Sequence, residues 1–145
     1  MTGVPPSTSI TGQAARIARD RHRLAALMLG SGALHLVAPK PYEKIVPRSL
    51  GDPRRVVAVS GVAELACGTL LLSRRTSRLG GLLTAALLVA VLPANVQMAL
   101  DAGTEHQAIP AIPPARFRAL ALARLPLQIP LVTRALRVAR ATNSV

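Results

Sequence analysis

Four apolar runs divide the chain, and charged residues, prolines or glycines separate them. The runs lie at residues 24–38, 56–73, 79–100 and 115–136. A membrane-spanning helix needs about 20 mostly apolar residues, a length that the third run reaches by itself. The first run reaches it when the preceding arginine-containing turn is included, because long basic side chains can extend to the lipid head groups. The pattern therefore predicts an all-α, integral membrane four-helix bundle with helices over about residues 19–38, 55–73, 78–100 and 115–136.

The residues outside these helices predict tails and turns. Residues 1–15 are small, polar and proline-containing, and we expect a flexible N-terminal tail there. Residues 139–145 are expected to form a C-terminal tail. Prolines and a glycine predict a turn-rich connection over residues 39–55. One domain, residues 16–138, then holds all four helices, as expected for a chain of 145 residues.

The fourth run is the least apolar, and its insertion into a membrane is finely balanced. Its central aliphatic side chains contribute about −3.5 kcal/mol to insertion, whereas an arginine at the centre costs about 2.5 to 3.5 kcal/mol. That arginine is Arg124, and Gln128, Pro126 and Pro130 make the sum unfavourable. We therefore expect Arg124 to need a partner inside the protein.

Composition narrows the class of protein. Half of the residues are hydrophobic, Tyr42 and Phe117 are the only aromatic ones, and the formal net charge is +12. The arginines stand in small groups between the apolar runs, and stacking aromatic side chains do not accompany them, which argues against nucleic acid as a partner. The single cysteine, Cys67, excludes a disulfide scaffold. We expect it to be a small apolar residue of its helix.

The distribution of lysine and arginine predicts the orientation. Ten of these residues flank the two termini and the connection between the second and third helices. Five lie in the connection over residues 39–55, or seven on that side when Arg116 and Arg118 are added. Because cytoplasmic segments carry the excess of positive charge, we expect a multi-pass protein of the cytoplasmic (inner) membrane with both termini in the cytoplasm. Tyr42 and Phe117 would then lie at the outer interface, where aromatic rings concentrate.

Each predicted helix carries a polar side chain at membrane depth. These residues are His35, Glu64, Asn95, and Arg124 with Gln128. Small residues at helical spacing flank His35 and Glu64, and they indicate faces that approach neighbouring helices closely. The small residues are Ser31, Gly32, Ser60, Gly61 and Gly68.

We expect these polar side chains to form one central cluster in which Glu64 neutralises Arg124 and the others complete the hydrogen bonds. Ionisable groups inside a membrane are costly and are often functional. One interpretation is that the cluster only holds the helices together. The other is a ligand, quinone or proton site, since histidine titrates near neutral pH.

Common catalytic signatures are missing from the sequence. It contains no C-x-x-C pair, no H-E-x-x-H motif, no glycine-rich phosphate loop and no visible Ser-His-Asp set. No second histidine lies near His35 in the sequence to suggest a metal site. The sequence therefore assigns no catalytic residue, no metal and no evident cofactor, while a quinone stays compatible with the polar cluster.

Four motifs carry a family resemblance. They are GALHLVAPKPYEKIVP (32 to 47), SGVAELACGTLLL (60 to 72), LPANVQMAL (92 to 100) and RLPLQIPLV (124 to 132). In this order and spacing they resemble the DoxX family, a group of small four-helix bacterial membrane proteins, over about residues 24–136. All five polar residues of the expected cluster lie within these motifs.

The resemblance implies the fold and the membrane location, and it suggests quinone-linked redox work. The family takes its name from a subunit of an archaeal thiosulfate:quinone oxidoreductase. We therefore expect a membrane subunit or scaffold of a larger complex, whose partners are the lipid bilayer, a protein subunit or a second copy of itself. The alternatives are a redox subunit whose polar cluster binds a quinone or relays protons, and a small-molecule or lipid permease. Whether the chain is an enzyme stays open.

Overall fold

The computed structural model describes residues 8–141, and within this range it contains helices and connections without a strand. The protein is therefore all-helical, as the apolar runs predicted. Three helical stretches are long and apolar enough to cross a membrane: Pro53–Leu72, Ser77–Leu100 and Pro114–Ala141. The elements in chain order are α1 (Thr8–Val37), α2 (Lys40–Lys44), the 3-10 helix η1 (Arg48–Leu50), α3 (Pro53–Leu72), α4 (Ser77–Ala90), α5 (Leu92–Leu100) and α6 (Pro114–Ala141).

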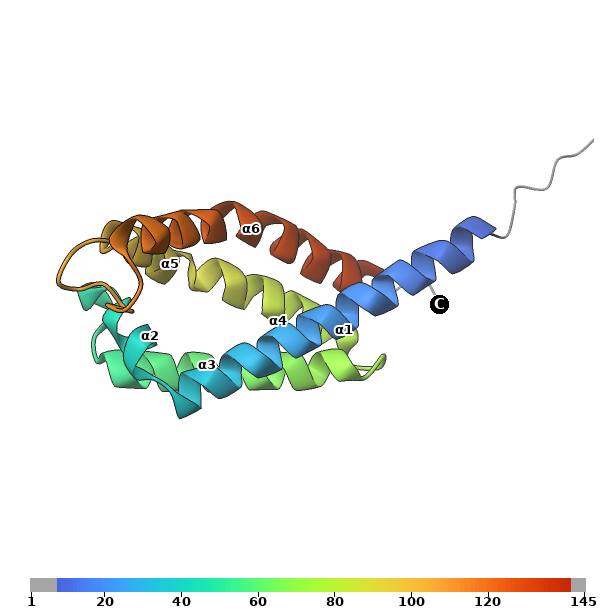
Figure 1. The fold of residues 1–145 in the computed structure, drawn as a ribbon. Coiled ribbons are helices and arrows are strands. Elements are labelled where there is room, and N and C mark those ends of the chain that lie inside the picture. Colours follow the sequence, from blue (N-terminus) through green and yellow to red (C-terminus); the bar gives the residue numbers. More distant parts are fainter. Residues whose placement is uncertain (1–7, 142–145) are drawn as a thin grey trace, which may run out of the picture.

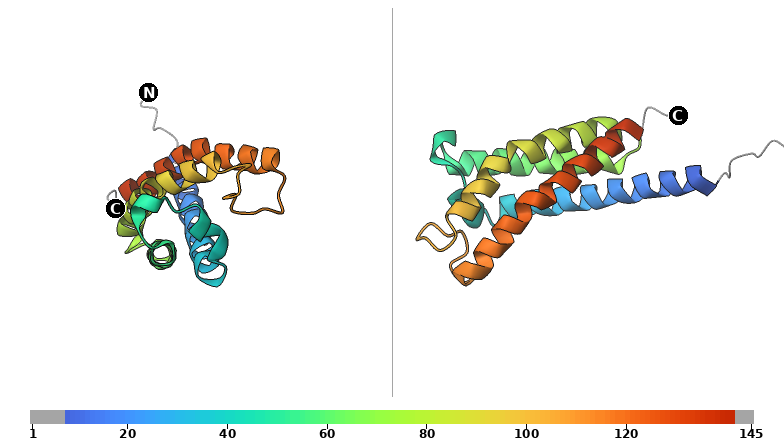
Figure 2. Two further views of the ribbon diagram at one scale, coloured as in Figure 1. Left: turned by 90° about the vertical axis from the view of Figure 1, so that its left-hand side faces the viewer. Right: turned by 90° about the horizontal axis from the view of Figure 1, so that it is seen from above.

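The long helices pack as two pairs (Figure 1). α1 lies along α3, and α6 lies along α4 and α5. A tight turn over residues 73–76 joins α3 to α4 and makes them neighbours. α6 crosses the other helices obliquely (Figure 2). The two pairs therefore meet at the end of the bundle that carries this turn and separate toward the other end.

Two apolar clusters form the interior, one toward each end of the bundle. The first joins α1, α3, α4 and α6 near the 73–76 turn and consists of Leu24, Ala25, Met28, Cys67, Leu71, Ala85, Leu88, Ala135 and Val138. The second joins α5, the following loop and α6, and consists of Met98, Ala99, Ala102, Ala108, Phe117 and Ala121. Ile45, next to α2, packs against this second cluster. The polar side chains at membrane depth occupy the zone between the two clusters.

Glycines bring the helices of each pair into close contact. A Cβ atom added to Gly32 would lie 2.7 Å from the carbonyl oxygen of Gly61, and one added to Gly68 would lie 2.7 Å from Cγ of Leu29. Similarly, a Cβ atom at Gly81 would lie 2.6 Å from the carbonyl oxygen of Ala135. The predicted close approach of the small-residue faces of α1 and α3 is therefore confirmed.

Two of the predicted tails are partly helical. α1 begins at Thr8 rather than near residue 19, and α6 continues to Ala141. Residues upstream of the apolar run, such as Ala14 and Arg16, are strong helix formers, so the helix needs no membrane to extend there. Val138, in the last turns of α6, is buried in the first apolar cluster, which holds this end in helical form. The rest of the predicted tails, residues 1–7 and 142–145, lies outside the described residues.

The predicted third helix, residues 78–100, is divided. α4 ends at Ala90, and α5 begins at Leu92. The cause is Pro93, which has no amide hydrogen and whose ring clashes with the carbonyl group four residues earlier in a continuous helix. The connection over residues 39–55 also differs from the expected turns, since it holds the two short helices α2 and η1.

Candidate functional site

The polar side chains of α1 and α3 meet at the glycine contact between these two antiparallel helices (Figure 1). A Cβ atom added to Gly61 would lie 2.9 Å from Cβ of His35, and one added to Gly32 would lie 3.0 Å from the backbone nitrogen of Leu65, the residue after Glu64. The close packing at the glycines therefore brings His35 and Glu64 together. Nδ1 of His35 lies 3.2 Å from Oε2 of Glu64, and the side chains are 14% and 8% exposed. The ring of Tyr42, from α2, covers His35 with a centroid distance of 3.9 Å.

The hydrogen on Nδ1 of His35 has two candidate acceptors. The carbonyl oxygen of Ser31 is 2.8 Å from Nδ1, closer than the carboxylate of Glu64. Oε2 of Glu64 is buried and has no hydrogen-bond partner among the described residues. Oε2 of Glu64, the oxygen in the 3.2 Å contact with His35, is therefore able to take part in a further hydrogen bond.

A second polar group joins α4, α5 and α6. Gln128 is buried, and its Nε2 donates a hydrogen bond to the carbonyl oxygen of Leu88. Its Oε1 accepts a hydrogen bond of 3.2 Å from Nδ2 of Asn95. Gln128 therefore links α6 both to the last turn of α4 and to α5, on either side of the break between these helices.

Arg124 does not form the predicted ion pair with Glu64. It lies one turn before Gln128 on α6, its side chain is exposed, and within residues 8–141 it makes neither an ion pair within 4.0 Å nor a hydrogen bond. The reason is the geometry of the pairs: α6 follows α4 and α5 away from α3, whereas His35 reaches Glu64 from the adjacent helix α1.

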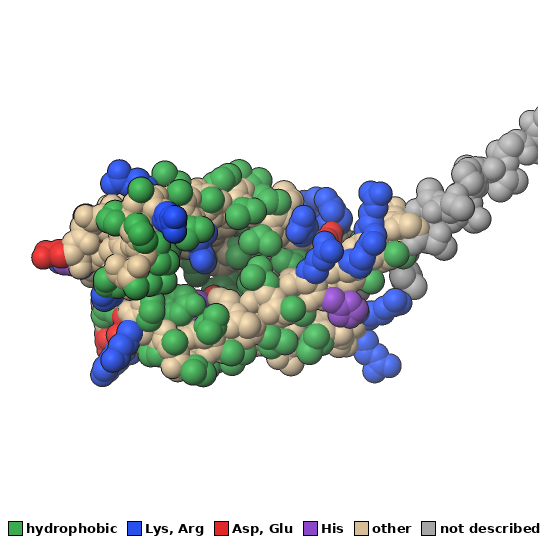
Figure 3. Space-filling model, viewed as in Figure 1, with side chains coloured by type: hydrophobic (Ala, Val, Ile, Leu, Met, Phe, Trp, Pro, Cys, Tyr) green, Lys and Arg blue, Asp and Glu red, His purple; other side chains and the backbone are tan. Residues whose placement is uncertain are grey.

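The expected single cluster is therefore two hydrogen-bonded groups on opposite sides of a hollow. Figure 3 shows the surface hollowed between α6 and α1, with basic side chains reaching toward it from the α6 side. His35 and Glu64 lie on the α1–α3 side, and Asn95 and Gln128 on the α4–α6 side. Arg124 is the charged group of the second side. We call the region between the α1–α3 pair and the α4–α6 pair, together with these five residues, the polar hollow.

Sequence reasoning missed the part that two other residues play. Tyr42 and Phe117 were expected at the membrane interface. Within the protein, Tyr42 stacks on His35, and Phe117 is buried in the second apolar cluster. Tyr42 could not have been placed, since the short helix α2 that presents it was not predicted.

A third polar group, also missed, closes the end of the bundle near the 73–76 turn. Nη1 of Arg21, a buried residue, donates to the carbonyl oxygens of Leu71 (2.8 Å) and Leu72 (2.5 Å) at the end of α3. A cation is favourable there because the last carbonyl groups of a helix lack partners within it. The sequence does hold a signal: Arg21 stands in helical register with the buried residues Leu24 and Met28.

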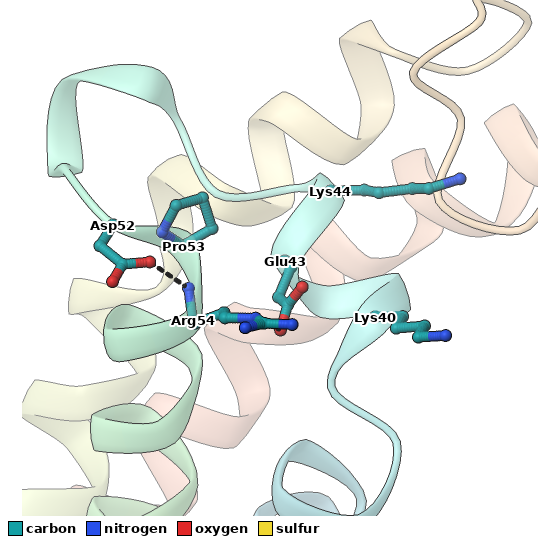
Figure 4. Close-up of a pocket in the computed structure, with 6 residues that line it drawn as sticks. All are labelled: Lys40, Glu43, Lys44, Asp52, Pro53 and Arg54. Atoms are coloured by element: carbon teal, nitrogen blue, oxygen red, sulfur yellow. Dashed lines mark hydrogen bonds and ion pairs between the residues drawn. The ribbon is translucent and has the colours of Figure 1, made fainter.

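The far end of the bundle carries a pocket of about 560 Å³ between α2 and the start of α3 (Figure 4). Asp52 caps α3 by accepting a hydrogen bond of 3.0 Å from the backbone amide of Arg54, and Nε of Arg54 lies 3.8 Å from Glu43. Lys40 and Lys44 extend away from these carboxylates. The contact of Arg54 with Glu43 joins the start of α3 to α2 beside this pocket. Among the described residues, no three His, Cys, Asp or Glu side chains gather as metal ligands would.

Comparison with known proteins places the chain in a family. The sequence model of the family described as "Domain of unknown function (DUF8561)" matches residues 24–139. The chain belongs to the DUF8561 family. The residues matched by DUF8561 include every member of the polar hollow and end before the tails. No curated protein and no solved structure matches the chain.

Proposed function

We propose that this DUF8561 protein spans the cytoplasmic membrane four times, with both termini in the cytoplasm. Three spans are α3, α4 with α5, and α6. We take α1 as the fourth because it lies along α3, although its apolar part covers only residues 24–37. The excess of lysine and arginine at the end with the two termini and the 73–76 turn supports this orientation.

We further propose that the protein is a DoxX-like membrane subunit of a quinone-linked complex, and that the polar hollow holds the quinone ring. The observation that carries this proposal is Arg124 in the middle of α6, whose guanidinium has no ion-pair or hydrogen-bond partner among the described residues. A cation at membrane depth is costly unless an acceptor meets it. A ligand with carbonyl oxygens supplies that acceptor.

The residues of the hollow fit a quinone ring. A quinone carries two carbonyl acceptors on opposite sides of its ring, and the hollow offers a donor from each side. These donors are Arg124 on α6 and, when the ring is doubly protonated beside Glu64, Nε2 of His35 on α1. Glu64 holds His35 in place and keeps a proton within reach of it, since Nδ1 of His35 and Oε2 of Glu64 are 3.2 Å apart. The bound quinone supplies the redox chemistry, and a partner subunit supplies the electrons. This chain binds and orients the ring and provides a proton at the histidine.

A scaffold without a small ligand is the second candidate. The hydrogen bonds of Gln128 to Asn95 and Leu88 favour a structural role, because they join three helices across the break before Pro93. In a scaffold, a carboxylate of a partner subunit would meet Arg124 in place of a quinone. The two candidates therefore differ in what neutralises the same guanidinium.

Purification in mild detergent separates these candidates. The full chain would be isolated with whatever accompanies it, and quinones, lipids and protein subunits would be quantified by mass spectrometry. We expect about one quinone per chain, lost in Arg124→Gln and retained in Arg116→Gln, an exposed arginine of the same helix. A stoichiometric partner protein without quinone, released by Arg124→Gln, would instead establish the scaffold and refute the quinone site.

The role of Glu64 is tested separately. Glu64→Gln keeps the shape of the side chain but cannot exchange a proton with His35. We expect the variant to assemble and to bind quinone while quinone reduction by the purified complex slows. Unchanged reduction in an assembled variant would refute a proton-supplying role.

A further inference from the structure

The end of the bundle near the 73–76 turn holds a second cavity that the polar hollow does not explain. It has a volume of about 380 Å³ and lies between residues 14–21 of α1, the 73–76 turn and the last turns of α6. We call it the arginine pocket. Its lining includes Ala14, Ile17 and Ala18 of α1, Arg74 and Arg75 at the turn, and Ala141 of α6. One wall is thus apolar and the other cationic.

The cationic wall is built from a turn that is fixed by its own hydrogen bonds. The backbone amide of Arg75 donates to the hydroxyl of Ser73 at 3.2 Å, and the hydroxyl of Ser77 donates to the carbonyl oxygen of Arg74 at 2.9 Å. The hydroxyl of Thr76 donates to the carbonyl oxygen of Leu70 at 2.6 Å instead of capping α4. This network holds the backbone of the two exposed arginines Arg74 and Arg75 beside an uncapped helix N-terminus.

The charge at this end is not neutralised within the protein. Asp20 is the one acidic residue among the described residues of this end, and it is already shared by Arg137, at 3.2 Å, and Arg134, at 3.9 Å. Arg21 already donates hydrogen bonds to the carbonyl groups at the end of α3. Arg74 and Arg75 therefore face the pocket with no carboxylate of the described chain within 4.0 Å. The two arginines are therefore available to bind an anion that is not part of the protein.

The apolar wall decides which kind of anion fits. Ile17 and Ala18 of α1 and Ala141 of α6 are half-buried and line the pocket, so a ligand must place apolar atoms against them while its charge meets the turn. The end of a membrane-spanning bundle lies at the depth of the lipid phosphates, where juxtamembrane arginines attract anionic lipids. Arginine forms paired hydrogen bonds with phosphate oxygens. The charge of the turn, its depth in the membrane and the apolar wall thus all favour a ligand with an anionic phosphate and an apolar chain.

We propose that the arginine pocket binds the phosphate of an anionic phospholipid, with the glycerol and the start of an acyl chain against α1 and α6. The site is separate from the polar hollow, and its test does not depend on a quinone. A bound lipid would join α1, the 73–76 turn and α6 at the end where the two helix pairs meet. It would therefore be a structural lipid of the bundle.

The test uses the full chain in detergent, titrated with phosphatidylglycerol, phosphatidylcholine or inorganic phosphate and observed by native mass spectrometry. The decisive variant is the double change Arg74→Gln and Arg75→Gln. Each juxtamembrane arginine contributes about a fivefold preference for an anionic lipid, so we expect the phosphatidylglycerol affinity to fall about 30-fold. The matched control removes an equally adjacent and exposed pair at the opposite end, Arg54→Gln and Arg55→Gln, and should leave the affinity unchanged.

A second variant separates a lipid from a free phosphate. Ala14→Trp fills the apolar wall without changing the charge, so it should weaken phosphatidylglycerol binding and spare any binding of inorganic phosphate. The lipid assignment is overturned if this variant binds phosphatidylglycerol as the unmodified chain does, or if inorganic phosphate alone occupies the site. It is also overturned if phosphatidylcholine binds equally well, or if the control pair at the opposite end matters as much as Arg74 and Arg75.

Discussion

Adding a single methyl group at Gly32 should separate α1 from α3 and open the contact between His35 and Glu64. The Cβ atom of Gly32→Ala would lie 2.7 Å from the carbonyl oxygen of Gly61 and 3.0 Å from the backbone nitrogen of Leu65. Ordinary contact begins near 3.4 Å, so the backbones must move apart by about 0.7 Å. Overpacking of this kind costs about 1 to 3 kcal/mol.

Gly30 provides a matched control two residues earlier on the same helix. A Cβ atom there meets nothing within 4 Å. Both changes gain the same helix propensity, about 1 kcal/mol for alanine over glycine, so this gain cancels when the two variants are compared. We therefore expect Gly32→Ala to be less stable than Gly30→Ala by about 1 to 3 kcal/mol.

Unfolding by sodium dodecyl sulfate in mixed micelles measures this difference. The chain has no tryptophan, so far-ultraviolet circular dichroism is the suitable signal. Equal unfolding free energies for the two variants would refute the close contact between α1 and α3. They would also remove the reason given above for the meeting of His35 and Glu64.

Three further predictions use the same protein preparation. Arg21→Met should lower the unfolding free energy by about 3 kcal/mol, because two carbonyl groups lose a charged donor. The control Arg23→Met, at an exposed position, should change it by less than about 0.5 kcal/mol. Equal effects of the two changes would contradict the contact of Arg21 with the end of α3. Gln128→Leu should lower the unfolding free energy by about 1 kcal/mol, which is typical for interhelical hydrogen bonds in membranes. An unchanged free energy would mean that the hydrogen bonds of Gln128 to α4 and α5 do not stabilise the protein. Cys67 is 4% exposed and should react with a maleimide only after denaturation, so rapid labelling of the native protein would contradict its burial.

Much of the fold could be predicted because membrane insertion leaves a simple pattern in the sequence. Apolar length alone located α3 and most of α6, and the small residues around Glu64 indicated which face of α3 meets α1. The break at Pro93 was less visible, since the run around it stays apolar on both sides. A proline at such a position can either kink a helix or divide it, and the sequence does not distinguish the two outcomes.

The candidate site was harder to predict because it depends on distances between helices that are far apart in the chain. Charge alone favoured Glu64 with Arg124, yet His35 meets the carboxylate because α1, not α6, packs on α3 at that level. The contact of Arg21 with the end of α3 was missed for a similar reason. An arginine beside an apolar run looks the same in the sequence whether it extends to the head groups or ends a neighbouring helix.

The claim that a quinone ring occupies the polar hollow is tested most directly by photolabelling. A light-activated quinone analogue, added to membranes that contain the full chain, would be crosslinked and the modified residues mapped by mass spectrometry. We expect labels on the segments around His35 and Arg124, suppressed by excess natural quinone and by Arg124→Gln. Labels that spread instead over lipid-facing side chains such as Val59 and Val62, unaffected by competitor, would contradict the account.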